Sequence, residues 1–306
     1  MNRITIYIWT ILWLIALVLA ACSQSQPEGE NSDRLKVVAT TSIVGDVVSN
    51  VGGESIDLVV LLPLGVDPHG YDPTPKNIVK ISEADVVFAN GAGLEEFLEP
   101  LLESAGAMDK IVHLSDGINL ASLENGHDEH GGEDPHTWMS PRNVMKWVET
   151  TVTVLSQLDQ ANAKSYQSNA AAYSAELANL DEWIKQQVAD VAIENRNIVT
   201  DHANFGYFAD EYGFLQVGAI ITGYSTMSEP SAQELAALED AVRELDINAI
   251  FVGNTVNPDL AERIAKDTGS RLVFVYTGSL SESGGDADSY INYMKYNISA
   301  IVVNLK

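Results

Sequence analysis

Residues 160–192 read QANAKSYQSNAAAYSAELANLDEWIKQQVADVA and contain neither Gly nor Pro. The spacing of apolar side chains predicts one amphipathic helix here, because such residues recur every three or four positions. They are Tyr166, Ala170, Tyr173, Leu177, Leu180, Ile184, Val188 and Val191. At about 1.5 Å per residue this helix would be roughly 45 Å long, enough to run along two lobes of a protein.

Short apolar and β-branched runs on both sides of this helix are typical of buried strands. They occupy Lys36–Thr40, Leu58–Leu62, Val86–Ala89, Ile198–Asp201, Ala249–Val252 and Leu272–Tyr276. Helical patterns alternate with them, at Ile43–Val51, Pro75–Glu83, Gly93–Ala105, Ser231–Leu245 and Pro258–Thr268. This alternation predicts an α/β fold with mostly parallel sheets. We therefore expect an N-terminal lobe at 35–159 and a C-terminal lobe at 193–306, joined by the long helix at 160–192.

The N-terminus has the layout of a signal peptide. Arg3 precedes an apolar run, Ile4–Leu19, and small residues then lead to Cys22. The run is shorter than a spanning helix needs, which favours cleavage of residues 1–21 over retention as an anchor helix. The sequence Leu19-Ala20-Ala21-Cys22 resembles the lipobox of bacterial lipoproteins. Lipidation of Cys22 would account for a lone cysteine in a secreted chain, and the polar residues 22–34 would form a flexible tether.

The net charge is −26, from 17 basic and 43 acidic residues. Such a balance argues against nucleic acid or an anionic lipid surface as the partner, and it suits an extracytoplasmic protein that attracts cations weakly. The lipobox and this charge predict a location outside the cytoplasm, at the periplasmic side of a membrane or the cell surface.

Three histidines lie in loops at the ends of predicted strands or helices. His69 lies in LGVDPHGYDP (64–73), His136 in DPHTWMSP (134–141), and His202 in TDHANFGYF (200–208). Ligands of open α/β sheets bind beyond the carboxyl ends of the strands, so the three imidazoles can meet in a cleft between the lobes. Three neutral imidazoles suit zinc. For each histidine alone, a hydrogen-bonded loop or core residue is the alternative interpretation.

These three segments, with SEPS (228–231) and DSYINYMKYN (288–297), resemble the zinc- and manganese-binding class of ABC-transporter solute-binding lipoproteins (cluster A-I, the periplasmic zinc-uptake receptor type). The resemblance covers nearly the whole mature chain. It implies two α/β lobes joined by a rigid helix, and a buried metal held by His69, His136 and His202. It also implies that the protein is a monomer without enzymatic activity, which delivers the metal to a membrane permease.

The fourth ligand position departs from that pattern, because Gly278 stands where the family usually has Asp. We expect water there. Glu282, Asp286 and Asp201 are weaker candidates, and Asp201 is better interpreted as a loop acid that accepts hydrogen bonds from backbone amides. Manganese-binding relatives commonly carry Glu at the position of His202, and manganese prefers oxygen donors. The nitrogen-rich set therefore favours zinc over manganese.

Several alternatives remain at the level of sequence. His127 and His130, in an acidic loop, either form an auxiliary metal site or belong to a solvated surface. A zinc ion with three histidines and water could also catalyse hydrolysis, although no His-x-His or His-Glu-x-x-His motif occurs. A surface protein for cell adhesion is a further possibility that no motif encodes. Trp138, Phe205 and Tyr207 would pack beside the ligand loops and exclude water from the metal.

Overall fold

The structure is a computed structural model that describes residues 34–122 and 132–306. The expected signal peptide, the lipidation site Cys22 and nearly all of the tether lie outside the described residues, as do His127 and His130. Leu35–Lys306 forms one compact unit.

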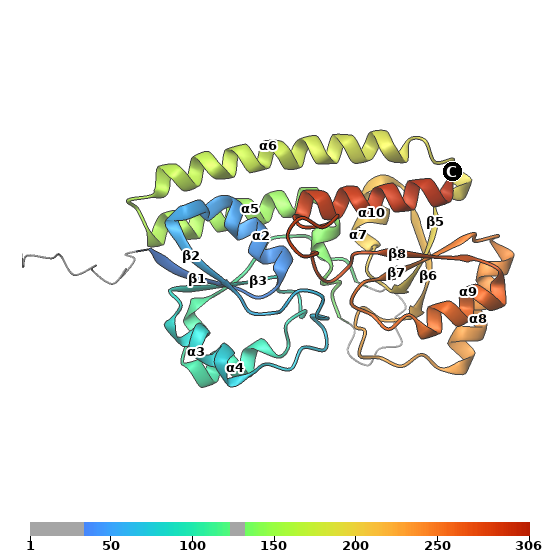
Figure 1. The fold of residues 1–306 in the computed structure, drawn as a ribbon, viewed down its shortest axis with the longest axis horizontal. Coiled ribbons are helices and arrows are strands. Elements are labelled where there is room, and N and C mark those ends of the chain that lie inside the picture. Colours follow the sequence, from blue (N-terminus) through green and yellow to red (C-terminus); the bar gives the residue numbers. More distant parts are fainter. Residues whose placement is uncertain (1–33, 123–131) are drawn as a thin grey trace, which may run out of the picture. The chain divides into compact units, whose positions relative to one another are not determined.

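The N-terminal lobe is built on a four-stranded parallel sheet in the order β2-β1-β3-β4 (Figure 1). Its strands are β1 (Leu35–Ala39), β2 (Ile56–Val60), β3 (Val86–Ala89) and β4 (Ile111–His113), and its helices are α2 (Ser42–Gly52), α3 (Pro75–Glu83) and α4 (Leu98–Ala105). Alternate strand residues face opposite sides of the sheet, so Val37 packs with the α2 side and Val38 with the α3 and α4 side.

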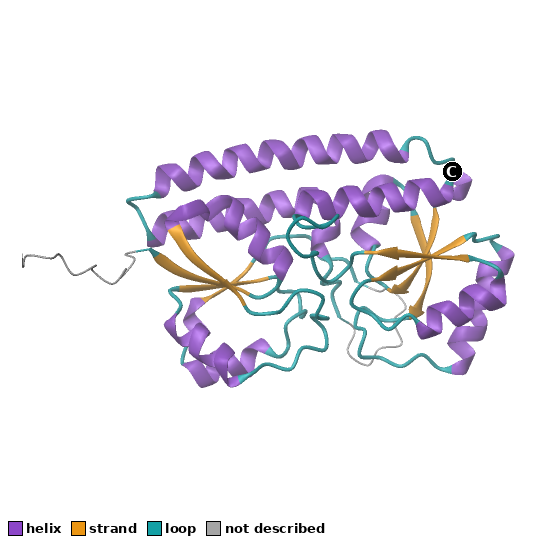
Figure 2. Cartoon of the chain, viewed as in Figure 1, coloured by secondary structure: helices purple, strands orange, loops and turns teal. Residues whose placement is uncertain are grey.

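The C-terminal lobe repeats this plan with the strand order β6-β5-β7-β8, again parallel (Figure 2). Its strands are β5 (Asn197–His202), β6 (Leu215–Ile221), β7 (Ala249–Gly253) and β8 (Arg271–Val275), and its helices are α7 (Gly206–Tyr212), α8 (Ala232–Glu244), α9 (Asp259–Thr268) and α10 (Tyr290–Leu305). Val199 and Ile250 pack toward α8 and α9, whereas Ile198 and Phe251 belong to the core that α10 covers.

Two long helices follow the first sheet in the chain, and the second of them spans both lobes. Helix α5 (Pro141–Leu158) follows the His136 loop, and helix α6 (Ala163–Val188) is 26 residues long. Helix α6 packs on α5 and α2 on the side of the first sheet and on α10 on the side of the second (Figure 1). The prediction of two parallel α/β lobes joined by one long helix is confirmed, although α6 begins three residues after the start of the expected segment 160–192 and ends four before its end.

One continuous hydrophobic core runs through both lobes and the connecting helices. It includes Phe88 of β3, Trp147 of α5, Tyr166 of α6, Phe208 of α7 and Tyr293 of α10, all fully or almost fully buried. Smaller clusters lie under α3 and α4 and under α8 and α9. A core shared in this way opposes wide separation of the lobes, because hinge opening would expose apolar surface to water.

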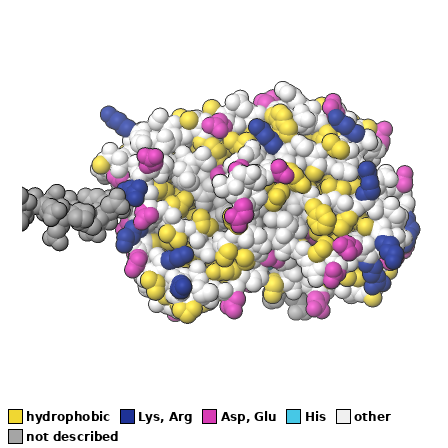
Figure 3. All heavy atoms as spheres, in the orientation of Figure 1, with side chains coloured by type: hydrophobic (Ala, Val, Ile, Leu, Met, Phe, Trp, Pro, Cys, Tyr) yellow, Lys and Arg dark blue, Asp and Glu magenta, His cyan; other side chains and the backbone are white. Residues whose placement is uncertain are grey.

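Figure 3 shows one face of the described chain. Acidic, basic and apolar side chains are interspersed on this face, and no single type forms a large patch. Within residues 34–122 and 132–306, no helix combines the length and apolar character needed to cross a bilayer.

Candidate metal centre

Each of the three candidate histidines is positioned by a different element. His69 lies in the loop between β2 and α3, and His136 immediately precedes a short 3-10 helix, Thr137–Met139, that leads into α5. His202 is the last residue of β5. The side chains of His136 and His202 are buried, at 1% and 3% exposure, whereas His69 is partly exposed.

The structure brings the three imidazoles together. The Nε2 atom of His136 lies 3.2 Å from Nε2 of His69 and 3.1 Å from Nε2 of His202. Two nitrogens bound to one tetrahedral zinc ion at roughly 2.0–2.1 Å lie about 3.3 Å apart. The observed spacing is therefore close to that of three donors around a common ion. Among the described residues, these histidines form the one group of three or more potential metal-ligating side chains whose donor atoms all lie within 4.8 Å of one another.

Asp201 fixes the tautomer of His202. Its Oδ1 atom lies 2.5 Å from Nδ1 of His202 and accepts the main-chain N–H of the same residue at 2.6 Å. Its Oδ2 atom accepts the main-chain N–H of Gly253. An ionised carboxylate only accepts hydrogen bonds, so we assign the imidazole proton to Nδ1. This leaves a lone pair on Nε2, directed toward the other two histidines.

Asp134 has the same relation to His136. Its Oδ1 atom accepts from the main-chain N–H of His136 at 2.9 Å and lies 2.8 Å from Nδ1 of the ring. Burial raises the pKa of Asp134 to about 7, while the backbone hydrogen bond from His136 and the proximity of His202 oppose the rise. When Asp134 is ionised, both Nδ1 atoms carry the imidazole proton and the two Nε2 lone pairs face each other at 3.1 Å, an arrangement that a cation between them would relieve.

Burial also keeps the imidazoles of His69 and His136 neutral. It lowers the pKa of His69 and that of His136 well below the ordinary value of 6.5, and the charge of neighbouring histidines adds to the effect. Neutral imidazole is the form that binds a metal, so burial removes proton competition at neutral pH.

The remaining coordination position receives no carboxylate in the described structure. Asp201 uses both oxygens on N–H groups of the protein, and Glu282 and Asp286 are exposed and lie outside the histidine group. At Gly278, a Cβ atom would lie 2.7 Å from Cδ of Pro68 and 3.1 Å from Oγ1 of Thr255. The space that an aspartate would need there is already filled.

A cavity of about 490 Å³ adjoins the site on the side of His69. Both lobes line this cavity. The N-terminal lobe contributes Ala92, Gly93, Leu94 and Pro135, and the C-terminal lobe contributes Tyr224, Ser225, Met227 and Ser228. Two exposed carboxylates, those of Glu96 and Glu133, also line it. Neither His136 nor His202 lines it. His69 is thus the ligand candidate that is reached from this cavity.

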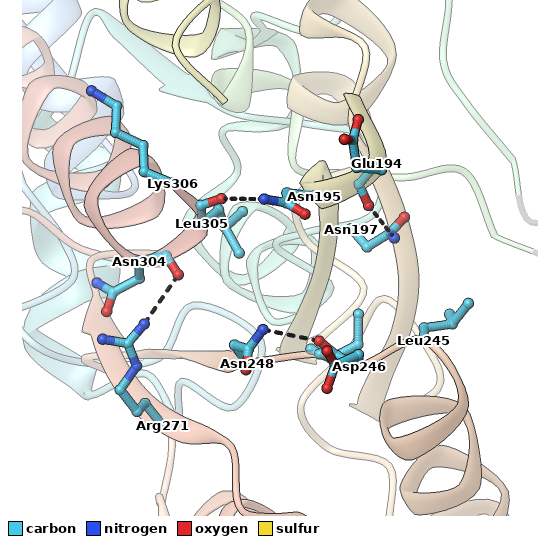
Figure 4. A pocket seen from close by; sticks show the side chains of 11 residues that line it. Glu194, Asn195, Asn197, Leu245, Asp246, Asn248, Arg271, Asn304, Leu305 and Lys306 are labelled. Carbon is cyan, nitrogen blue, oxygen red and sulfur yellow. Dashed lines mark hydrogen bonds between the residues drawn. The ribbon is translucent and has the colours of Figure 1, made fainter. Parts of the chain in front are cut away.

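Figure 4 shows a second pocket, of about 200 Å³, and none of the three histidines lines it. It includes Asn197, the first residue of β5, whereas His202 ends that strand about 16 Å away. The side-chain amides of Asn195, Asn197 and Asn248 donate to main-chain carbonyls around its rim, as the dashed lines show. These hydrogen bonds serve local backbone structure, and no candidate ligand residue lies in this pocket.

The aromatic neighbours hold the ligand loops in place. Tyr207 donates its hydroxyl proton to the main-chain oxygen of Asp134 at 2.8 Å. Trp138 is buried, lies 5.2 Å from His136 between ring centroids, and donates Nε1–H to the main-chain oxygen of Thr277 at 3.1 Å. Phe205 is buried at the start of α7.

Sequence reasoning overlooked Asp134 and Asp67. Both occur in the tripeptide Asp-Pro-His, at 67–69 and 134–136, and in each case the aspartate accepts a hydrogen bond from the main-chain N–H of the histidine two residues later. The repeated tripeptide was the signal that could have identified them. His113 ends β4 and is not part of the histidine group.

Comparison with known proteins identifies the family to which this chain belongs. Residues 37–304 match the protein family described as zinc-uptake complex component A, periplasmic. The chain is 36% identical over 297 residues to the manganese-binding lipoprotein MntA of Halalkalibacterium halodurans, with 96% of this chain and 97% of the relative covered. It is 33% identical over 302 residues to the manganese ABC transporter substrate-binding lipoprotein PsaA of Streptococcus mitis, with the same coverage.

Solved structures show the same architecture. The periplasmic zinc-binding protein TroA of Treponema pallidum superposes with a TM-score of 0.82 at 25% identity, over 89% of this chain and 99% of that one. The Mn-bound periplasmic metal-binding protein of Candidatus Liberibacter asiaticus gives a TM-score of 0.79 at 28% identity, over 89% and 100% of the two chains. With a family match over almost its whole length, this chain belongs to the metal-binding substrate-binding lipoproteins of ABC transporters.

Proposed function

We propose that this protein captures zinc outside the cytoplasm, holds it with His69, His136 and His202, and delivers it to the permease of an ABC transporter. The observation that carries the proposal is the convergence of three Nε2 atoms, at 3.1 and 3.2 Å from the central one, with two of the imidazoles held by buried carboxylates. We expect water at the fourth position, since no carboxylate of residues 34–122 and 132–306 joins the three histidines.

The donor set favours zinc. All three donors are nitrogens, and manganese prefers sites with more oxygen ligands and a higher coordination number. The position that carries Asp in the family is Gly278, and Pro68 fills the space beside it. Manganese is the second candidate, because MntA and PsaA, which are 36% and 33% identical to this chain, carry manganese in their names.

The residues have separate tasks in this function. Asp134 and Asp201 orient the imidazoles and keep the lone pairs on Nε2. The shared core and helix α6 restrict movement of the lobes. Metal release at the permease then depends on small shifts of the ligand loops rather than on wide opening of a hinge.

A zinc hydrolase is disfavoured by the same geometry. Asp134 and Asp201 lie at the Nδ1 side of their imidazoles, away from the metal, and no Asp or Glu of the described residues joins the Nε2 group. No carboxylate of the described residues is therefore found within this group of nitrogens to act as general base toward a metal-bound water. We also propose that the chain is monomeric and is anchored to a membrane by lipid on Cys22.

Calorimetric titration of the purified chain with zinc and with manganese tests this function. We expect one zinc per chain, and zinc that displaces manganese at equal concentration. His202→Ala should lose most of the zinc affinity, while His113→Ala, which changes a histidine outside the site, should bind as the wild type does. Stronger binding of manganese than zinc by the wild-type protein would contradict the proposed metal.

The variant His202→Glu probes the selectivity directly. It replaces one nitrogen donor with oxygen, so the ratio of zinc to manganese affinity should fall. An unchanged ratio would show that the donor at position 202 does not set the choice of metal.

A further inference from the structure

Two loops from different lobes meet beside His69. One is the loop at 64–73, which carries His69, and the other follows β6 and includes Thr226. Thr226 donates its hydroxyl proton to Oδ2 of Asp67 at 2.5 Å. The other oxygen of Asp67, Oδ1, accepts the main-chain N–H of His69 at 3.0 Å. A single carboxylate therefore connects the backbone of a metal-ligand candidate to the opposite lobe.

A second contact joins the same loops. The Sδ atom of Met227 packs so closely on Gly70 that a Cβ atom at that position would lie only 2.9 Å from it. Met227 is 68% exposed, so its apolar side chain rests on the 64–73 loop without being buried in a core. The two loops thus touch on both sides of His69 in the sequence, at Asp67, two residues before it, and at Gly70, directly after it.

The contact lies at the route into the site. His69 lines the cavity of about 490 Å³ together with Tyr224, Ser225, Met227 and Ser228 from the second loop. His136 and His202 are buried and do not reach the cavity. Loss of metal toward this cavity requires the His69 loop to move away from the other lobe, and the hydrogen bond between Thr226 and Asp67 opposes that movement.

From this arrangement we propose that the Thr226–Asp67 hydrogen bond is a latch that retains the bound metal. Neither side chain contacts the metal; Asp67 is a positioning residue that acts through His69, and Thr226 holds Asp67. This inference rests on the proposed function of the same site. The latch acts on the rate of release, because the His69 loop must withdraw before the ion leaves, whereas capture proceeds from the state in which the loop is already free to move.

The test is the rate of zinc release from the purified, zinc-loaded chain, measured by stopped flow with an excess of a chromogenic chelator. Thr226→Val removes the hydroxyl and keeps the shape of the side chain, and release should be about tenfold faster, as expected for the loss of one charge-assisted hydrogen bond. Thr226→Ser keeps the hydroxyl and should release zinc within about twofold of the wild-type rate. The association rate should stay unchanged in both variants.

Thr222→Val is the matched control, because the Thr222 hydroxyl donates to Glu234 within the same lobe. It should release zinc at the wild-type rate. Asp67→Ala breaks the latch from the other side and also frees the N–H of His69, so release should accelerate at least as much as in Thr226→Val. Adding Thr226→Val to Asp67→Ala should then cause no further acceleration, since the bond is already broken.

The outcomes separate the latch from the proposed function. If wild-type protein takes up zinc and Thr226→Val releases it at the wild-type rate, the latch is wrong and the metal site stands. If the two substitutions accelerate release independently, the residues do not act through one bond and the latch is equally overturned. If the wild-type protein takes up no zinc, the proposed function itself fails. Should Thr226→Val not fold, Asp67→Ala gives the same comparison with the wild type.

Discussion

Replacing Asp201 with asparagine tests whether the carboxylate behind His202 determines which nitrogen of that imidazole can bind a metal. Asp201 accepts four N–H groups, two from His202, one from the main chain of Gly253 and one from the side-chain amide of Asn204. An asparagine cannot accept all four, because one of its two terminal atoms is itself a donor. In one orientation the new amide N–H₂ faces His202 and forces the imidazole proton to Nε2. In the other it faces the N–H of Gly253.

The magnitude follows from what each orientation costs. A proton on Nε2 removes the lone pair that the metal needs, and the loss of a carboxylate partner of a metal-bound histidine weakens metal affinity by roughly 10- to 100-fold, or about 1.4–2.8 kcal/mol. The opposite orientation leaves two buried donors facing each other at Gly253, which costs about 1–3 kcal/mol of folding free energy. Asp201→Asn should therefore lower the zinc affinity, the free energy of unfolding, or both in part.

The assay is competition for zinc against a chelator of known affinity at pH 7.5, with urea unfolding of the metal-free protein measured beside it. Asp240→Asn serves as the control, because Asp240 is 84% exposed on α8 and distant in sequence from the histidine loops. It should match the wild type in both measurements. An Asp201→Asn protein with wild-type zinc affinity and wild-type stability would refute the assigned tautomer.

Three further substitutions have defined expectations. Gly278→Asp should not strengthen zinc binding. It should lower the free energy of urea unfolding by about 1–3 kcal/mol, because the new Cβ would overlap Pro68. A gain in zinc affinity would show that the loop around position 278 moves to admit the aspartate. Burial lowers the pKa of His69 in the folded protein. As the pH falls through 6.5, His69 therefore binds a proton in the unfolded chain but not in the folded protein. The contribution of His69 to metal-free stability should then decline by up to about 1.4 kcal/mol per pH unit, and His69→Gln should reduce the overall slope between pH 7.5 and 5.5 by that amount in unfolding curves. Trp138→Phe removes the hydrogen bond to the carbonyl of Thr277 in the other lobe and should cost about 2 kcal/mol, measured by the same method; wild-type stability would mean that this contact contributes little.

The regular elements of this chain were largely predictable from local sequence. Val86–Ala89 and Pro75–Glu83 have the predicted bounds. The reasons are physical: β-branched runs pack well in buried parallel strands, and Pro fits the first turn of a helix, where no amide hydrogen bond is lost. The long apolar periodicity likewise identified α6.

Strand β6 was not predicted, and helix α4 was predicted with the wrong start, because both sequences carry mixed signals. Strand β6 contains Gly218, which in sequence weakens a strand pattern. In the structure this glycine lets α8 pack closely, because a Cβ there would lie 2.6 Å from Cδ1 of Leu238. Helix α4 was expected from Gly93 but begins at Leu98, and Ala92 and Gly93 adopt positive φ in the turn before it.

The site was predictable in part. The loop histidines could be placed at one edge of each lobe from the positions of the strands, and the expectation that Asp201 accepts backbone amides agrees with its bonds to the main chain of His202 and Gly253. Asp201 also accepts a hydrogen bond from the imidazole of His202. That contact depends on the direction of both side chains at the end of β5, which the spacing of residues in the sequence does not give. The interlobe bond from Thr226 to Asp67 joins residues 159 positions apart, and no local pattern predicts such a pair.

X-ray absorption spectroscopy at the zinc edge of the zinc-loaded protein tests the central claim most directly, because it reports the atoms bound to the ion. The structure predicts three imidazole nitrogens and one oxygen from water at roughly 2.0–2.1 Å, with one imidazole fewer in His202→Ala. A carboxylate in the coordination shell, or fewer than three imidazoles in the wild-type protein, would contradict the assignment of His69, His136 and His202 as the ligands.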